Sequence, residues 1–180
     1  MVEREIKLEF PTLEAARTAV GALGLPSLRP RRLQDDALFD TVDGSLRERG
    51  CALRIRRDGA ATVLTYKGPA EEGPMKVRPE FETGATDPAT LGTILEALGY
   101  GVVFRYQKYR EEFGDSRCVV ALDESPVGVF VELEGDEDRI VELAARLGFG
   151  PDAYLTTSYS RLHQERGAAL GLGRDMVFPA

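Results

Sequence analysis

Two carboxylates and an ammonium alternate along one short segment near the start of the chain. Glu3, Glu5 and Lys7 stand two residues apart in the sequence VEREIKLEF. If this segment is a β-strand, all three side chains project from one face. Two oxygen ligands beside a fixed cation suit the binding of a metal-phosphate complex. A strand face in contact with water also carries mixed charges, so this row gains meaning only if other strands repeat it.

Other segments do repeat the alternation, and one of them contains a second Glu-x-Glu pair. Arg side chains can bind phosphate oxygens through two parallel hydrogen bonds, and Lys side chains supply point charges. Carboxylates suit Mg²⁺ or Mn²⁺, which are hard ions that bind oxygen. The pattern therefore favours a site for a metal and a polyphosphate. The candidate acids are Glu3, Glu5, Glu80, Glu82, Asp123, Glu132 and Glu134, and the candidate bases are Lys7, Arg54, Arg56, Lys67, Lys76, Arg78, Lys108 and Arg110.

Composition excludes several other kinds of chemistry. The formal net charge of the 180 residues is -7, which argues against a protein that spreads along nucleic acid by neutralising phosphates. His163 is the only histidine, so a histidine-dependent triad or a multi-histidine zinc site lacks its ligands. Cys51 and Cys118 lack metal-ligand spacing and are too few for a disulfide framework.

The two cysteines suit a reducing compartment, where they would remain free thiols in or near the core. No apolar run approaches the length of a membrane-spanning helix, and Met1 leads into a charged strand rather than a signal region. We therefore expect a cytoplasmic protein with no nucleic-acid partner and no membrane partner. The length predicts a single domain over residues 1–166. The Gly-containing segment 167–180 is predicted to be a C-terminal tail with partial disorder.

Two kinds of periodicity predict the elements that position these residues. Apolar side chains at helical spacing predict helices over 12–23, 87–98 and 137–147, and a short helix near 157–166. Between them the period changes to two, and turn signals such as Asp58-Gly59 separate the runs. These runs predict antiparallel strands near 2–10, 31–40, 51–58, 61–67, 75–83, 101–113, 117–123 and 128–134.

Most of these strands would have one apolar face and one face that carries both signs of charge. The long strand over 101–113 is polar on both faces, so its inward side is ambiguous. A flat sheet with helices on one side and water on the other would satisfy the pattern. Alternatively, eight strands closed into a barrel would place the charged rows inside and the helices outside.

The charged rows occur within segments that, in this order and spacing, resemble the CYTH family of triphosphate tunnel metalloenzymes. This family includes class IV adenylate cyclases, thiamine triphosphatases and inorganic tripolyphosphatases. The resemblance extends over nearly the whole chain. The segments that carry it include Glu3-Arg4-Glu5-Ile6-Lys7, Leu38-Phe39-Asp40-Thr41, Arg54-Ile55-Arg56, Lys76-Val77-Arg78, Val131-Glu132-Leu133-Glu134-Gly135 and Thr157-Ser158-Tyr159.

The resemblance implies an α+β fold, in which an eight-stranded antiparallel β-barrel forms a triphosphate tunnel with helices packed outside. Lys67 and Lys76 would take part in catalysis, and Glu80 and Glu82 would brace neighbouring cations. Metal would be bound by Glu3, Glu5, Asp123, Glu132 and Glu134. The triphosphate would be bound by Lys7, Arg54, Arg56, Lys67, Lys76, Arg78, Lys108 and Arg110.

Our leading functional hypothesis is a phosphohydrolase that depends on Mg²⁺ or Mn²⁺ and acts on tripolyphosphate, thiamine triphosphate or a nucleoside triphosphate. A class IV adenylate cyclase, which converts ATP to cyclic AMP and pyrophosphate, is the first alternative. A triphosphate-binding or polyphosphate-sensing module without catalysis is the second, and a charged β-sandwich without this function is the third. The sequence leaves open the number of metals, the general base, and whether a homodimer forms on an outer tunnel wall.

Overall fold

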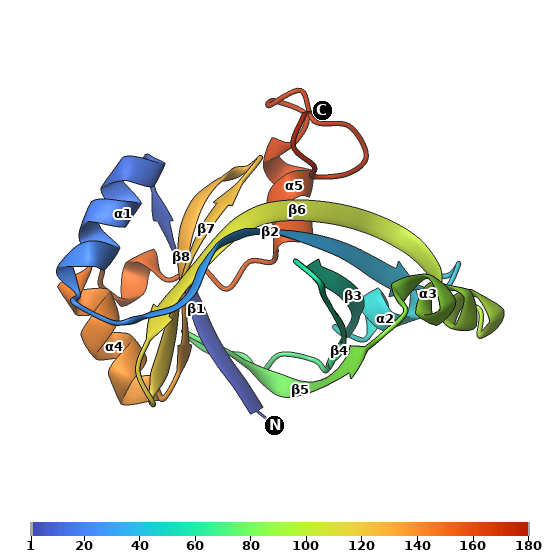
Figure 1. Ribbon diagram of the computed structural model, residues 1–180, viewed down its shortest axis with the longest axis horizontal. Helices are drawn as coiled ribbons and strands as arrows, with labels where there is room; N and C mark the ends of the chain where they lie inside the picture. The colour runs from blue at the N-terminus through green and yellow to red at the C-terminus, as the bar shows by residue number, and fades with distance from the viewer. Residues whose placement is uncertain (1, 180) are drawn as a thin grey trace.

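The computed structural model describes residues 2–179, in which eight strands close into one antiparallel barrel (Figure 1). The order around the barrel is β1-β5-β4-β3-β2-β6-β7-β8. This closure decides between the two predicted arrangements in favour of the barrel, and the predicted α+β fold is confirmed. The strands are β1 (Val2–Phe10), β2 (Ser27–Asp40), β3 (Ala52–Asp58), β4 (Ala61–Lys67), β5 (Lys76–Ala85), β6 (Gly101–Gly114), β7 (Cys118–Ser125) and β8 (Gly128–Gly135).

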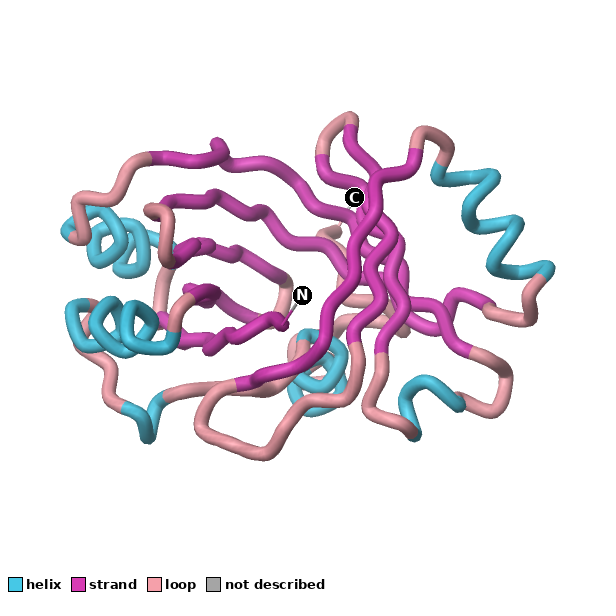
Figure 2. The backbone as a smooth tube through the Cα atoms, turned by 90° about the horizontal axis from the view of Figure 1, so that it is seen from below, coloured by secondary structure: helices cyan, strands magenta, loops and turns pink. Residues whose placement is uncertain are grey.

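Helices lie outside the ring of strands (Figure 2). Two of them have first turns capped by Thr12 and Asp87, whose side chains accept backbone N–H hydrogen bonds. Within residues 2–179, no helix combines the length and the apolar character required to cross a membrane. The helices are α1 (Leu13–Ala22), α2 (Ser45–Glu48), α3 (Pro88–Ala97), α4 (Glu137–Arg146), the 3-10 helix η1 (Pro151–Ala153) and α5 (Tyr159–Arg166).

The main hydrophobic core lies between α1, α4 and the outer faces of β1, β7 and β8. Ile6, Leu8 and Leu133 of the strands are fully buried against Ile140 and Leu143 of α4. Because side chains alternate across a strand, packing Ile6 and Leu8 outward turns Lys7 inward. The outer core therefore fixes which face of each strand lines the barrel interior.

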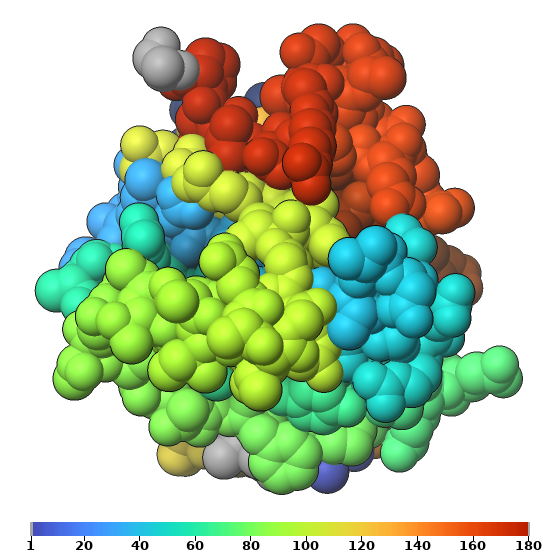
Figure 3. All heavy atoms as spheres, turned by 90° about the vertical axis from the view of Figure 1, so that its right-hand side faces the viewer, coloured from blue at the N-terminus to red at the C-terminus, as the bar shows by residue number. Residues whose placement is uncertain are grey.

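The opposite side of the barrel, which faces the viewer in Figure 3, has a smaller cluster of buried apolar side chains than the main core. There α2 and α3 pack near β3, and Leu95 is the buried residue of α3. Ile94 and Leu98 of the same helix are 50% and 67% exposed, and Phe81 on β5 is 61% exposed. This wall therefore holds its shape chiefly through strand pairing rather than through a deep apolar core.

The segment after α4 completes the barrel, and the C-terminal segment packs on its outer surface. Leu155 pairs with Lys7 through two backbone hydrogen bonds, of 3.0 and 2.9 Å, on the edge of β1 that β5 leaves free. Met176 forms a parallel bridge with Tyr106 of β6, and its side chain is fully buried. Met176 therefore packs on the barrel, and the partial disorder expected for the tail over 167–180 remains a prediction. The composition of the segment did not show that β6 has a free edge beside Tyr106, where β7 does not pair, or that apolar contacts are available there.

Candidate active site

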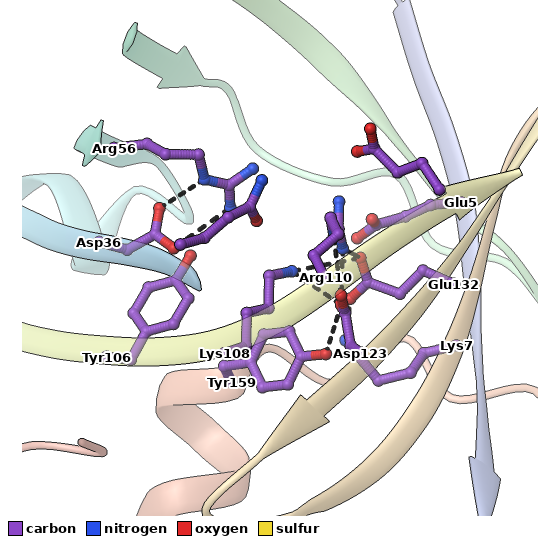
Figure 4. Close-up of polar contacts among 12 residues, drawn as sticks. Glu5, Lys7, Asp36, Arg56, Tyr106, Lys108, Arg110, Asp123, Glu132 and Tyr159 are labelled. Atoms are coloured by element: carbon purple, nitrogen blue, oxygen red, sulfur yellow. Dashed lines mark hydrogen bonds and ion pairs between the residues drawn. The ribbon is translucent and has the colours of Figure 1, made fainter. Parts of the chain in front are cut away.

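The barrel encloses a continuous cavity of about 1410 Å³ whose wall carries the charged rows (Figure 4). All the predicted phosphate-binding cations line it, as do Glu3, Glu5, Glu132 and Glu134. Asp123 is the exception, since it is fully buried behind the lining side chains. The strand over 101–113, which is polar on both faces, lies in β6, and it turns Lys108 and Arg110 inward. The tertiary structure thus collects one face from almost every strand into a single site.

One group of lining residues forms a compact network of ion pairs, which we call the basic network. The Asp123 carboxylate accepts hydrogen bonds from Lys108 Nζ at 2.8 Å and from Arg110 Nε at 2.7 Å. Glu132 pairs with Lys7 at 3.2 Å and also with Arg110. The members are Lys7, Lys108, Arg110, Asp123 and Glu132, so three cations face two carboxylates.

Burial and mutual attraction set the ionisation of the basic network. Burial disfavours the charged form of Glu132, but Lys108, Lys7 and Arg110 outweigh it and hold the pKa of Glu132 well below its ordinary value. Burial and the neighbouring charge of Arg110 lower the pKa of Lys108 to about 8, although Asp123 and Glu132 act in the opposite direction. The network therefore retains an excess positive charge that favours an anion in the lumen.

A second group on β1 and β8 has the opposite character, and we call Glu3, Glu5 and Glu134 the acidic group. Glu5 and Glu134 are direct cross-strand partners, an arrangement that is unfavourable for two like charges. Lys76 Nζ lies 3.0 Å from Glu5, and the Glu3 carboxylate contacts cations of β4 and β5. Within residues 2–179, Glu134 forms no ion pair within 4.0 Å.

Among the described residues, Glu134 lacks a compensating cation, whereas Glu3 and Glu5 each contact at least one. The Glu134 side chain is open to the lumen, yet the surrounding protein, Glu3 and Glu5 together raise its pKa to about 7. Among the described residues, no three acidic, histidine or cysteine side chains already form a metal cage. The donor set nevertheless fits a hard divalent cation, because it consists of carboxylate oxygens whose mutual repulsion such an ion would relieve.

The structure divides the predicted metal ligands between these two groups. Glu3, Glu5 and Glu134 remain together, whereas Asp123 and Glu132 have cations as their neighbours. The roles predicted for all five remain proposals. The Glu-x-Glu spacing placed Glu132 and Glu134 on one strand face but did not show that the partners of Glu132 would be lysine and arginine from neighbouring strands.

A third contact set surrounds two arginines of β3. Asp36 of β2 is fully buried and accepts a hydrogen bond from Arg56 Nε at 2.8 Å, while Arg54 Nε lies 3.4 Å away. Arg54 also donates to Thr65 at 3.1 Å and to Tyr106 at 3.4 Å. Sequence analysis did not single out Asp36. The sequence contained one indication of its position: in an extended strand, Asp36 lies on the same face as Gln34 and Leu38.

The acids of β5 lie beside cations, as sequence analysis expected. Glu80 lies 2.8 Å from Lys67 Nζ, and Glu82 accepts a hydrogen bond from Thr65 at 2.6 Å. Glu82 also lies 3.4 Å from Arg54. Such contacts suit side chains that orient the basic lining. Tyr159, the first residue of α5, belongs to a segment that carries the family resemblance but was assigned no role in the site. It donates a hydrogen bond to Asp123 at 2.8 Å.

Comparisons with known proteins agree with this tunnel architecture. The CYTH domain matches residues 1–147, and the chain belongs to that family. A protein of Methanocaldococcus jannaschii named "Putative adenylate cyclase MJ0240" is 28% identical over 173 residues, which cover 90% of this chain and 98% of that protein.

Solved structures share the fold. The PH1819 protein of Pyrococcus horikoshii superposes with a TM-score of 0.76 at 25% identity, over 91% of this chain and 99% of that one. HpAC1 of Hippeastrum, for which a dominant triphosphatase activity is described, has a TM-score of 0.69 at 22% identity, over 91% and 95% of the two chains. Both solved structures thus share the fold of this chain.

Proposed function

We propose that this protein is a phosphohydrolase that depends on Mg²⁺ or Mn²⁺ and cleaves a triphosphate bound in the barrel lumen. The observation that carries the proposal is the juxtaposition of the basic network with the acidic group in one continuous cavity. Phosphoryl transfer requires positioning and neutralisation of charge more than covalent chemistry by the protein. A lumen lined by cations from six strands suits a linear anion that carries several charges.

The chain's own residues supply most of this environment. Arg54 and Arg56, fixed by Asp36, present guanidinium groups suited to phosphate oxygens. Lys7 and Lys108 supply point charges to the same lumen. Because these donors are already held by ion pairs, little reorganisation accompanies the growth of charge on the leaving phosphate.

Glu5 and Glu134, with Glu3 beside them, are the residues that would hold the metal. A bound divalent ion would polarise a phosphate oxygen and supply positive charge at the acidic group. Lys67 and Lys76 contact Glu3 and Glu5 in the structure. We assign these two lysines to catalysis because they stand where the acidic group meets the cationic wall.

Product identification tests this function directly. Purified protein is incubated with tripolyphosphate, thiamine triphosphate or ATP in the presence of Mg²⁺ or Mn²⁺, and the products are identified by phosphorus NMR. We expect orthophosphate and the corresponding diphosphate, with no turnover in EDTA. Glu134→Gln purified in parallel controls for contaminating phosphatases. Tight binding without turnover in any condition would support a sensing module instead.

A class IV adenylate cyclase is the second candidate, and a specific feature of the cavity favours it. The cavity lining includes apolar as well as charged side chains, which suits contact with an organic group attached to the triphosphate. The name of the Methanocaldococcus relative agrees with this alternative. The cyclase would be supported if the protein converts ATP to cyclic AMP and pyrophosphate and releases no orthophosphate from tripolyphosphate. The apolar lining includes Leu38, Leu53, Val103, Phe104 and Leu172.

A further inference from the structure

Tyr159 connects a helix outside the barrel to the basic network inside it (Figure 4). It is the first residue of α5 and is 7% exposed. Its hydroxyl donates to Asp123 Oδ2 at 2.8 Å, the same oxygen that accepts from Lys108. Because Asp123 also accepts two hydrogen bonds from Arg110, the hydroxyl helps to fix the carboxylate that orients both cations.

The ring of Tyr159 also contacts both lysines of the network. Lys7 Nζ lies 4.5 Å from the ring centroid and Lys108 Nζ lies 4.7 Å from it, within the range of cation–π attraction. The two lysines are only 4% and 2% exposed. A further carboxylate would also stabilise them, but it would cancel their charge and occupy their N–H donors. A ring face attracts an ammonium while leaving its charge available to an anion.

The surrounding structure holds the ring in this position. Leu155 pairs with the backbone of Lys7 four residues before Tyr159, so the chain enters α5 from a fixed point on β1. The ring then stacks on Tyr106 at a centroid distance of 5.8 Å and meets Phe130 edge-on at 5.8 Å. These contacts leave Tyr159 little freedom to turn away from the lysines.

We propose that Tyr159 is a positioning residue, whose ring holds Lys7 and Lys108 toward the lumen and whose hydroxyl fixes Asp123. The inference rests on the proposed function, because those lysines are the groups assigned to the triphosphate. It assigns a role in the site to α5, which lies outside the barrel. The hydroxyl and the ring make separate contributions that can be separated by substitution.

A series of ring substitutions of nearly constant size tests the cation–π contribution. Tyr159→Phe removes the hydroxyl and keeps the ring, and fluorinated phenylalanines at position 159 then weaken the negative ring face stepwise. Binding of tripolyphosphate in EDTA is measured by calorimetry. We expect the Kd to rise progressively from phenylalanine to the trifluorinated ring, on the order of tenfold in total. A Kd that does not depend on fluorination would overturn the role of the ring.

A matched control separates positioning from simple support of the fold. Leu162 is buried on the same helix, and Leu162→Ala loosens the packing of α5 without touching either lysine. We expect this variant to melt at a lower temperature while keeping the wild-type Kd for tripolyphosphate below that temperature. If Leu162→Ala weakens binding as much as the trifluorinated ring does, Tyr159 acts only through the stability of α5.

A readout without substrate distinguishes failure of this inference from failure of the proposed function. Protein without metal or phosphate is treated briefly with acetic anhydride, and acetylation of Lys7 and Lys108 is measured by peptide mass spectrometry. We expect Tyr159→Leu to change acetylation of both lysines several-fold, with Tyr159→Phe close to wild type. If wild type neither binds nor hydrolyses any triphosphate, the proposed function fails while this result still decides the positioning role. Unchanged reactivity in Tyr159→Leu would overturn it.

Discussion

The basic network and the acidic group occupy the same lumen but balance their charges in opposite ways. In the basic network each carboxylate contacts at least two cations, and Asp123 and Lys108 are almost completely buried. In the acidic group, Glu134 faces Glu5 across the strand pair and has a raised pKa. One region is internally compensated and contributes to the fold. In the other, Glu3 and Glu5 contact cations, but Glu134 retains a repulsion with Glu5 that a bound cation would relieve.

This contrast indicates which residues the protein can lose without unfolding. Removing one member of a buried, compensated network leaves its partner as an isolated buried charge. Removing one member of a group of like charges relieves repulsion. Substitutions in the two regions are therefore expected to separate activity from stability.

The largest expected effect is on activity, from Glu134→Gln in the acidic group. A divalent ion contributes several kcal/mol to phosphoryl transfer, and about 1.4 kcal/mol corresponds to a tenfold change in rate. We expect metal-dependent turnover to fall by roughly 10³-fold while the melting temperature stays equal or rises, as measured by steady-state kinetics and thermal unfolding. Glu5→Gln should lower turnover to a similar extent, but it should also cost stability because it removes the ion-pair partner of Lys76. Full activity in either variant would remove that residue from the metal site.

The basic network should respond in the opposite sense. Asp123→Asn removes the charge that compensates Lys108 and Arg110, and breaking a buried ion pair costs about 3–5 kcal/mol of folding free energy. Urea denaturation of the purified variant measures this loss. Asp152→Asn, at an exposed position in η1, is the matched control and should unfold like the wild type. If the two variants have equal stability, the network does not support the fold.

An intermediate effect is expected at Arg56, which lines the lumen next to outward-facing Arg57. Hydrogen bonds to charged groups contribute about 1.5–3 kcal/mol, so Arg56→Ala should raise the KM for triphosphate roughly tenfold to a hundredfold. Arg57→Ala removes the same charge from the outer face and should leave KM unchanged. Equal effects in the two variants would mean that the overall charge, rather than a contact in the lumen, attracts the substrate.

The smallest expected effect is a pH dependence of stability in the absence of metal. The pKa of Glu134 in the folded protein, about 7, lies above its ordinary value of 4.5. Its stabilising contribution is therefore complete below pH 4.5 and is lost as the pH rises through 7. We expect the melting temperature in EDTA to fall by a few degrees between pH 5 and pH 8. Glu134→Gln should reduce this dependence, and added Mg²⁺ should offset it; an identical slope in the variant would contradict the assignment.

Much of the lumen could be predicted because alternation is a local property of the chain. Once Ile6 and Leu8 are taken as outward-facing and apolar, Lys7 must face inward, whatever the partner of β1 is. The same alternation predicts that Arg54 and Arg56 of β3 face inward. It was insufficient for the strand over 101–113, where both faces are polar and contacts with other strands and with the C-terminal segment decide which face is inside.

Partners across strands could not be predicted in the same way. Asp36 meets Arg54 and Arg56 because β2 pairs with β3 in a particular register, and a shift of one residue would reverse its face. Tyr159 reaches the lysines only because Leu155 joins the edge of β1. Neither contact produces a periodic pattern in the amino-acid sequence from which it could be predicted.

The sequence by itself determined the alternating charged rows, the helical caps and the inventory of acids and bases, because each depends on residues close together in the chain. The tertiary structure decided the division between the basic network and the acidic group. Closing eight strands fixes their order and register at once, and that register sets Glu134 opposite Glu5 but Glu132 opposite Lys7. Two carboxylates on one strand face therefore acquired different neighbours, and the neighbours set the charge that each one carries.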